Sequence, residues 1–246
     1  MGTRIHTPIK FNHRPLTAGE VKYLVIHYTA GNYERAKHIF EHPEKFHEVS
    51  VQFVLDIDGT VDEVIPTLGG STFVANHCGA SYWIENGEFI SGFNQFSIGV
   101  EIVNCNGNLI PYTEAQYISV ISLVKQLQSL YPALKSPTAL LGHDHIAGFR
   151  GKIDLGIHFD WKRVFEACYG AASFAPMAAI RLPDLLLKLF EGYLPFEPVD
   201  NKEDIIDFWR KISATMESAI TLLNNGISIN LVAQTAAIAL NPLKIG

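Results

Sequence analysis

The chain has 246 residues, of which 48% are hydrophobic and 18% charged, and its formal net charge at pH 7 is -6. This composition supports a folded core and excludes a largely disordered chain. The negative charge argues against a nucleic-acid-binding protein, because such proteins present a basic face to the phosphates. The three cysteines, Cys78, Cys105 and Cys168, form no CxxC pair, so we expect thiols rather than a disulfide framework.

The N-terminal segment and the apolar runs bear on localisation. The first residues contain no apolar stretch typical of a secretory signal. No run of about 18 apolar residues predicts a transmembrane helix. We therefore expect a product that is cytoplasmic as synthesised, and any action on the cell wall would require export by a non-Sec route.

The first hundred residues alternate between patterns typical of strands and of helices. Residues 21–30 read as a buried strand with His27 near its end, and a helix over 33–43 follows. Residues 49–66 hold two alternating runs around Asp58-Gly59, which is typical of a hairpin. A further apolar strand over 96–103 contains one charged residue, Glu101.

The next elements follow the same alternation. Thr113 and Gln116 predict a capping box that opens a helix ending near Tyr131. A strand over 138–145 and a short helix over 158–170 complete the series. The apolar face expected for the long helix consists of Ile118, Ile121, Val124, Leu127 and Leu130.

These elements predict an α/β fold in which a central mixed β-sheet is flanked by helices. After residues 170–176 the pattern becomes purely helical, with helices expected over 201–225 and 227–242. We therefore divide the chain into a catalytic domain over 1–170 and a small all-helical C-terminal extension over 176–246. Because so small a helical unit cannot bury its apolar residues alone, we expect it to pack on the first domain, on a second copy or on a partner protein.

The polar stretch GHDHIAGFRGKIDLG (142–156) indicates half of a metal site. His143 follows a predicted strand, as His27 ends another, and Asp154 lies eleven residues after His143. Two imidazoles and one carboxylate are a recognised catalytic zinc set that leaves one position for water. His145 is the main alternative to His143 as a ligand.

Two further charged residues point to the same cleft. Glu101 interrupts an apolar strand, and burying it without a partner would cost several kcal/mol. We therefore expect it to face a partner or a cleft. Lys152 lies two residues from Asp154, which places it within reach of the same cleft.

Five ordered blocks resemble the zinc-dependent N-acetylmuramoyl-L-alanine amidases of the AmpD-like amidase-2 group, which is related to peptidoglycan recognition proteins. The blocks are VIHYTAG (25–31), VSVQFVLDIDGTVDEVIP (49–66), ANHCGAS (75–81), NQFSIGVEIV (94–103) and GHDHIAGFRGKIDLGIHFDW (142–161). The resemblance covers about residues 20–170 and implies a zinc ion in a surface groove. It implies hydrolysis of the amide between N-acetylmuramic acid and L-alanine, in peptidoglycan or in muropeptides.

The resemblance also implies roles for single residues. The residues at matching positions are the zinc ligands His27, His143 and Asp154, the water-activating acid Glu101, the oxyanion-stabilising cation Lys152, and the groove-lining residues His77 and Asn94. Because the blocks end near Gly170, we expect the catalytic site to be complete without the extension.

The chain departs from the family pattern at several positions. Many relatives carry His at the position of Gln52, and some carry Tyr at the position of Val51, so more of the proton handling falls on Glu101 here. The loop that leads to the third ligand is one residue longer than usual, and Leu155 replaces a common proline. Residues 83–92 lack the Arg of the cytoplasmic recycling enzymes, which argues against specificity for anhydro-muropeptides.

Two other functions stay open at this point. A non-catalytic peptidoglycan-binding module is one, although such relatives usually lack the third ligand that Asp154 supplies here. A zinc peptidase that cuts the stem peptide is the other. A thiol nucleophile at Cys78 is disfavoured because no matching base accompanies it. Recycling, phage lysis and an interbacterial effector role all fit the sequence.

Overall fold

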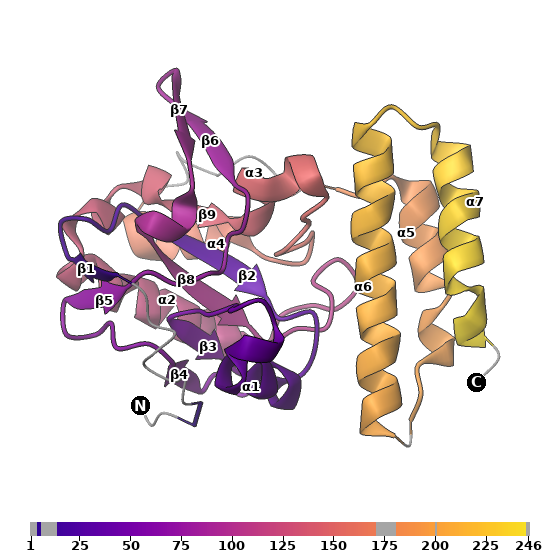
Figure 1. Ribbon diagram of the computed structural model, residues 1–246, viewed down its shortest axis with the longest axis horizontal. Helices are drawn as coiled ribbons and strands as arrows, with labels where there is room; N and C mark the ends of the chain where they lie inside the picture. The colour runs from indigo at the N-terminus through magenta and orange to yellow at the C-terminus, as the bar shows by residue number, and fades with distance from the viewer. Residues whose placement is uncertain (1–3, 6–13, 171–180, 200, 245–246) are drawn as a thin grey trace.

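The computed structural model describes residues 4–5, 14–170, 181–199 and 201–244. A mixed five-stranded sheet lies between helices, and three further helices stand together beside it (Figure 1). The predicted fold class is therefore confirmed. The boundary expected at residues 170–176 falls within 171–180, outside the described residues, and the division into two domains stays a prediction.

The central sheet has the order β4-β3-β8-β2-β9. Its strands are β2 (Tyr23–Tyr28), β3 (Phe53–Leu55), β4 (Val61–Glu63), β8 (Ser97–Ile102) and β9 (Leu140–Gly142). β2 runs parallel to β8 and β9, and β3 runs parallel to β8, whereas β4 is antiparallel to β3. Because the carboxyl ends of parallel strands meet at one edge, this edge is where a site is expected.

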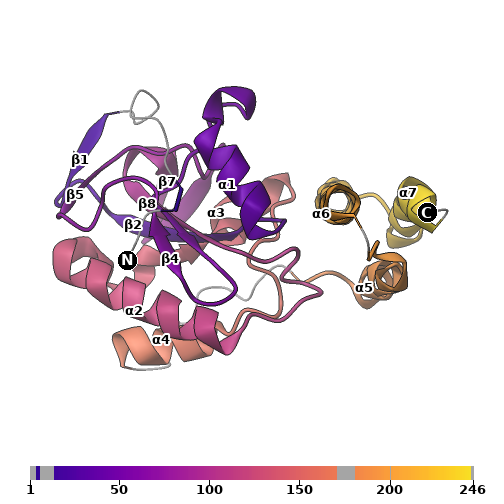
Figure 2. The ribbon, with the colours of Figure 1, turned by 90° about the horizontal axis from the view of Figure 1, so that it is seen from below.

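Helices cover both faces of the sheet (Figure 2). One face carries α1 (Tyr33–Glu41), and the other carries α2 (Glu114–Leu130) and α4 (Trp161–Tyr169). The predicted capping box is present, with the Thr113 and Gln116 side chains each accepting from the other residue's backbone N–H at 3.1 and 3.0 Å.

The apolar face predicted for α2 is confirmed at Val124 and Leu127, which are buried, and Ile121 and Leu130 pack partly buried against the core, but the prediction was wrong at Ile118. Ile118 is 60% exposed. The side chains that α2 buries are Gln116, Tyr117, Val120, Leu123, Val124 and Leu127. Tyr117 faces inward because its ring packs near Phe159, with 5.7 Å between ring centroids, and its hydroxyl donates to the His158 carbonyl.

Several short elements differ from the expected pattern or were not predicted. The strand expected over 138–145 is shorter, because α3 (His143–Ala147) begins directly after β9. The unpredicted strands are β1 (Pro15–Thr17), β5 (Ser71–Phe73), β6 (Tyr82–Glu85) and β7 (Glu88–Ser91). The β6–β7 hairpin projects from the body of the domain (Figure 1). Short 3-10 turns occupy Pro43–Lys45, Phe93–Gln95, Pro132–Lys135, Pro137–Ala139, Gly148–Arg150, Leu194–Phe196 and Asn241–Lys244.

The extension is helical, as expected, but it contains a helix that the sequence did not predict. It comprises α5 (Asp184–Glu191), α6 (Lys202–Asn224) and α7 (Ile229–Leu240). Their shared core includes Leu186, Phe190, Phe208, Ile212, Met216, Val232 and Leu240. Among the three, α6 lies nearest the sheet domain (Figures 1 and 2). Of the helices described, none combines the length and apolar character needed to cross a membrane.

Candidate metal centre and groove

The expected ligands converge at the carboxyl edge of the parallel strands. His27, near the end of β2, is the register partner of Glu101 in β8. On the other side of β2, Ile26 pairs with Gly142, the last residue of β9, and His143 follows directly. Sheet topology therefore brings together residues that are more than a hundred positions apart.

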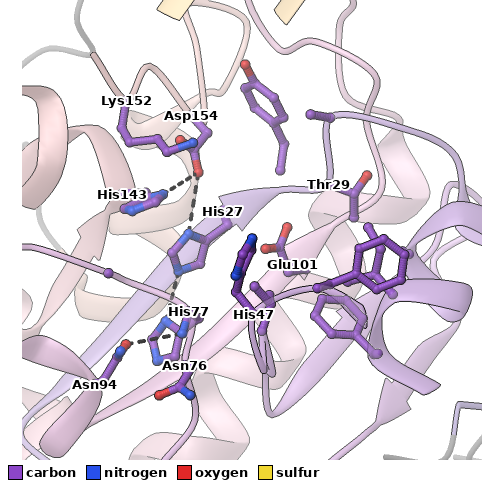
Figure 3. A pocket seen from close by; sticks show the side chains of 18 of the residues that line it. His27, Thr29, His47, Asn76, His77, Asn94, Glu101, His143, Lys152 and Asp154 are labelled. Carbon is purple, nitrogen blue, oxygen red and sulfur yellow. Dashed lines mark hydrogen bonds and ion pairs between the residues drawn. The ribbon is translucent and has the colours of Figure 1, made fainter. Parts of the chain in front are cut away.

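The donor atoms of His27, His143 and Asp154 form a compact, buried group (Figure 3). The Asp154 Oδ2 atom lies 3.0 Å from His143 Nδ1 and 3.4 Å from His27 Nδ1. Ligand atoms about 2.0–2.2 Å from a tetrahedral ion lie about 3.3–3.6 Å apart, so the observed separations are close to those of a zinc site. The three side chains therefore fit a metal ion by spacing and by donor chemistry.

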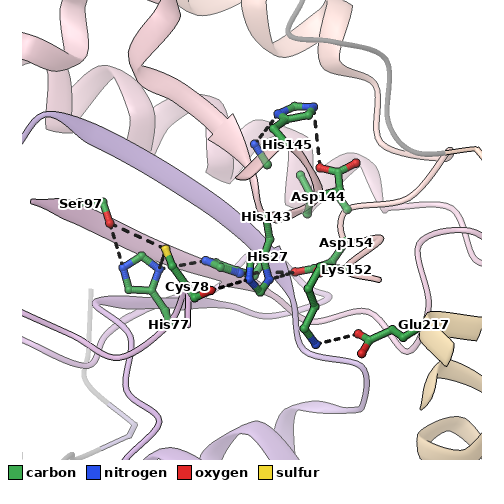
Figure 4. Close-up of polar contacts among 12 residues, drawn as sticks. His27, His77, Cys78, Ser97, His143, Asp144, His145, Lys152, Asp154 and Glu217 are labelled. Atoms are coloured by element: carbon green, nitrogen blue, oxygen red, sulfur yellow. Dashed lines mark hydrogen bonds and ion pairs between the residues drawn. The ribbon is translucent and has the colours of Figure 1, made fainter. Parts of the chain in front are cut away.

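The alternative ligand His145 points elsewhere. Its Nδ1 atom accepts from the Gly142 backbone N–H at 2.8 Å, and its Nε2 atom lies 3.7 Å from Asp144 Oδ1. Its ring packs near Trp161, with 5.3 Å between ring centroids. Side chains two positions apart on a helix do not share a face, and His143 and His145 leave α3 in different directions (Figure 4).

Hydrogen bonds behind His27 favour the tautomer that a metal requires. Its Nε2 atom lies 3.0 Å from His77 Nδ1, and His77 Nε2 lies 3.2 Å from the Ser97 hydroxyl (Figure 4). That hydroxyl donates to the Phe93 carbonyl at 2.6 Å. If each ring donates from Nε2, every bond in the chain has one donor and one acceptor, and the Nδ1 lone pair of His27 faces the metal position.

His143 has a comparable partner. Its Nε2 atom lies 3.1 Å from the Cys78 carbonyl, which also accepts from Arg150 Nη2 at 2.7 Å. Arg150 Nη2 also lies 3.1 Å from His143 Nε2, but its shorter contact, at 2.7 Å, is with the Cys78 carbonyl. With the guanidinium donating to that carbonyl, the ring can donate from Nε2 to the same oxygen and keep its Nδ1 lone pair for a metal. Both histidines are therefore held with Nδ1 toward Asp154.

The two predicted groove residues lie in the cavity wall and also have structural contacts. His77 contacts the ring of His27, as described above, while Asn94 Oδ1 accepts from the backbone N–H groups of His77 and Cys78 at 3.1 and 2.8 Å. Both residues line the cavity. Their role in substrate binding stays a prediction.

Burial and hydrogen bonding set the charge state of the centre. Burial and, after it, the neighbouring His143 lower the pKa of His27 to about 4, so the imidazole is neutral and able to bind a metal. Burial opposes ionisation of Asp154, but its contacts with His143 and His27 outweigh this effect and hold its pKa well below the usual value. The centre thus combines neutral imidazoles with an ionised carboxylate.

Glu101 lies beside this centre with a free acceptor. Its Oε2 atom is buried and has no hydrogen-bond partner among the described residues. Burial raises the pKa of Glu101 to about 8, with the Asp154 charge as a second cause. A buried carboxyl oxygen without a partner is costly, which indicates that it meets a group absent from the chain itself.

A cavity of about 710 Å³ opens in front of these residues. Its wall includes Glu101, Lys152 and Arg150 from the sheet domain and Glu217 from α6. Sequence reasoning had missed Arg150 and Glu217, as well as Tyr28, which also lines the cavity. The cavity therefore extends onto the extension through Glu217, and the expectation that the catalytic site is complete without the extension stays a prediction.

The departure at Gln52 has a structural explanation. Its Oε1 atom accepts from the Gly99 backbone N–H at 2.6 Å, and its Nε2 atom donates to the Phe73 carbonyl at 2.9 Å. The side chain is fully buried and does not line the cavity. Gln52 therefore connects backbone segments and takes no part in proton transfer at the groove.

A second group of donor atoms adjoins the first. His27, His77 and Cys78 also lie close enough to hold an ion. Burial raises the pKa of the Cys78 thiol, which disfavours the thiolate that binds metals. Because the first group includes an ionised carboxylate and faces the cavity, it is the better candidate.

Comparisons with known proteins support this reading of the fold. Among curated proteins, AmpD of Haemophilus influenzae, a 1,6-anhydro-N-acetylmuramyl-L-alanine amidase, is 39% identical over 74 residues, or 30% of this chain and 38% of that protein. AmpD of Enterobacter cloacae is 40% identical over 70 residues, covering 28% and 35% of the two chains. The matches thus span less than half the length of these relatives.

Solved structures share the fold at low identity. An AmpD crystal structure has a TM-score of 0.52 at 24% identity, covering 68% of this chain and 95% of that one. Escherichia coli AmiD, solved with an anhydro-N-acetylmuramic acid peptide, has a TM-score of 0.52 at 19% identity, covering 91% and 90%. Since residues 1–170 are about 69% of the chain, the likeness to AmiD extends into the helical extension.

A family model gives the broadest sequence match. The Amidase_2 model, described as N-acetylmuramoyl-L-alanine amidase, matches residues 17–157. This range includes the three candidate metal ligands and is more than half of the chain, which confirms the resemblance drawn from the five sequence blocks. The chain belongs to the Amidase_2 family of N-acetylmuramoyl-L-alanine amidases.

Proposed function

We propose that this protein is a zinc-dependent amidase that cleaves the bond between N-acetylmuramic acid and L-alanine in peptidoglycan or muropeptides. One observation carries the proposal. His27, His143 and Asp154 present donor atoms at near-tetrahedral spacing, and the cavity in front of them is lined by Glu101 and Lys152. Membership of the amidase family supplies the reaction class.

His27, His143 and Asp154 would hold the zinc ion. When bound, zinc lowers the pKa of water and polarises a carbonyl oxygen. The protein's contribution is to keep the two Nδ1 lone pairs and the Asp154 carboxylate aimed at one point. The bonds from His27 to His77 and from His143 to the Cys78 carbonyl achieve this.

Glu101 would act as the general base and then as the general acid. Its unpartnered Oε2 atom accepts the proton of the attacking water, and the same carboxyl later delivers it to the leaving amine of L-alanine. Burial raises the pKa of Glu101, and a less acidic carboxyl is a stronger base toward water. The loss of a second proton-handling residue at Val51 and Gln52 concentrates this role on Glu101.

Lys152 would stabilise the negative charge that develops on the scissile carbonyl oxygen. Burial disfavours its ammonium, but the Asp154 and Glu217 carboxylates outweigh burial and raise its pKa, so it stays charged. A fixed cation in a partly buried groove stabilises an oxyanion without reorganisation during the reaction. The other candidate function is a non-catalytic binding module. Binding alone would not require Glu101 and Lys152 to line the same cavity as the three candidate metal ligands.

The test is mass spectrometry of muropeptides and sacculi digested with the zinc-loaded protein. Amidase action releases intact stem peptides and leaves free lactyl ends on the glycan. A stem peptidase would leave shortened stems on N-acetylmuramic acid. No product with either substrate, from a folded protein that binds zinc, would favour the binding module. Glu101→Gln is the matched control, because it keeps the ligands and removes the base.

A further inference from the structure

We propose that Glu217, on α6 of the C-terminal extension, is a positioning residue for Lys152, so that the extension completes the active groove. This inference rests on the proposed amidase function. It goes beyond it by assigning a role to a residue outside the part of the chain that matches the family model, which ends at residue 157.

The central observation is a direct ion pair. Lys152 Nζ donates to Glu217 Oε1 at 2.7 Å, and both side chains line the cavity (Figure 4). The two side chains are 27% and 31% exposed, so the pair is partly shielded from water. A lysine side chain has a flexible stem of four carbons, and a partner at its end restricts the position of the ammonium group.

The loop that carries Lys152 is held against α6 along its length. The Thr221 hydroxyl lies 3.3 Å from the Arg150 carbonyl and 2.9 Å from the Glu217 carbonyl of its own helix, and the Asn224 side chain donates to the Gly148 carbonyl at 3.0 Å. Gly151, between them, has a φ of +91°, and a Cβ atom there would lie 2.2 Å from the Thr221 hydroxyl. Only glycine allows so close an approach of loop and helix.

A buried side chain anchors the same loop in the extension. Ile153 is 0% exposed and belongs to the hydrophobic cluster formed by α5, α6 and α7. Its neighbours in sequence are Lys152, which faces the cavity, and Asp154, the candidate ligand. One short segment therefore joins the extension core to both functional side chains.

A second contact shows that α6 packs on more than one loop of the sheet domain. Asn106 Nδ2 donates to the Ser213 hydroxyl at 3.2 Å, and that hydroxyl donates to the Cys105 carbonyl at 3.3 Å. Both loops meet the same side of α6. The helix is thus fixed relative to the sheet domain, and Glu217 holds a defined place at the groove.

The first test is Glu217→Gln in the full-length protein, which keeps the size of the side chain and removes its charge. We expect kcat for muropeptide cleavage to fall about 5–50-fold, with KM and zinc affinity within about twofold of wild type. Glu203→Gln, which removes an exposed charge from the first turn of the same helix, should leave all three unchanged. An unchanged or higher kcat in Glu217→Gln would overturn the proposal. A loss of zinc affinity as large as the loss of kcat would overturn it too.

A double-mutant cycle separates positioning from a general structural effect. If Glu217 acts through Lys152, then Glu217→Gln should have no further effect in a Lys152→Gln background. Additive losses would overturn the proposal.

A third measurement is independent of activity. In an NMR spectrum of lysine ammonium groups, the Lys152 Nζ resonance is the one that is absent from Lys152→Gln. It should be visible in the wild type and lost or broadened in Glu217→Gln. If that resonance persists unchanged in Glu217→Gln, the proposal is wrong. If the wild type cleaves no amide while the resonance behaves as expected, the proposed function fails and the positioning contact stands.

Discussion

His77 Nδ1 lies 3.0 Å from His27 Nε2, on the side of the His27 ring that faces away from Asp154. Beyond His77 the chain of hydrogen bonds continues to Ser97 and ends on the Phe93 carbonyl. A metal ligand whose second nitrogen is fixed in this way has a set tautomer and ring orientation. His77 therefore supports the metal centre, in addition to any contact with substrate.

His77→Phe should weaken zinc binding about 10–100-fold, the usual effect of removing the partner of a ligating histidine. The ring volume is retained, so the cavity should keep its shape. Competition with a chelator of known affinity measures the change. Ser97→Ala, one bond further away, should have a smaller effect. Zinc affinity unchanged in His77→Phe would show that His27 is oriented by other means.

The ligand assignment predicts a clear difference between neighbouring histidines. His27→Ala, His143→Ala and Asp154→Ala should each lose stoichiometric zinc, whereas His145→Ala should retain it, because the His145 ring is directed at Gly142 and Trp161. Metal content after dialysis, measured by atomic emission, tests this. Retention by His143→Ala together with loss by His145→Ala would reverse the assignment.

Glu101→Gln should separate catalysis from metal binding. The amide cannot accept the proton of water, so kcat should fall by about two to four orders of magnitude. Zinc content should equal that of wild type, since Glu101 is not among the three donors. Single-turnover cleavage of a defined muropeptide measures the rate. A variant that turns over at the wild-type rate would remove Glu101 from the mechanism.

Glu101 also predicts how the stability of the metal-free protein depends on pH. Its pKa is about 8 in the fold against 4.5 for the ordinary group, so between these values the folded state binds more protons than the unfolded state. The free energy of unfolding should therefore decrease as the pH rises, by about 1.4 kcal/mol per unit where the difference is complete. Glu101→Gln should lack this decrease.

The titration of His27 limits the pH range in which the effect of Glu101 on stability can be measured. Burial lowers the pKa of His27 to about 4, and this makes stability rise with pH up to its ordinary value of 6.5. Denaturant titrations at pH 6.5, 7 and 7.5 with a chelator present follow wild type and Glu101→Gln while that opposing effect fades, and what remains of it is common to both proteins and cancels in their difference. If the two proteins respond equally to pH in this range, the Glu101 carboxyl is already ionised in the fold.

Removal and return of the metal tests the proposed cofactor directly. A strong chelator should abolish muropeptide cleavage, and added zinc should restore it, because His27, His143 and Asp154 supply no nucleophile themselves. Full activity after verified metal removal would contradict the proposed reaction. Circular dichroism before and after chelation is the control for unfolding.

The predictable parts of the fold are those governed by local pattern. The strand around His27 was expected because six successive residues of β2 are buried, and such a strand reads as an apolar run. The helix after Thr113 was expected from its capping box. At the start of that helix the exposure of Ile118 and the burial of Tyr117 could not be predicted, because the contact between Tyr117 and Phe159 joins distant parts of the chain.

The candidate site also has predictable and unpredictable parts. The three donor residues stand in sequence blocks that resemble the amidase family, so they could be predicted. The contacts of His77 with His27 and of Glu217 with Lys152 span 50 and 65 positions, and nothing in the local pattern around Glu217 sets it apart from the other acidic residues of α6. Such pairings appear only when the helices are packed in three dimensions.

Ile153 has a thermodynamic consequence. Because its side chain is part of the extension core while the next residue is a candidate ligand, metal occupancy and the folding of the helices are linked equilibria. An ion that binds only the folded centre should raise the melting temperature of α5, α6 and α7 along with that of the sheet. Trp209, buried in α6, would then report metal binding through its unfolding transition. By reciprocity, a variant that loosens the helices should release the ion more readily.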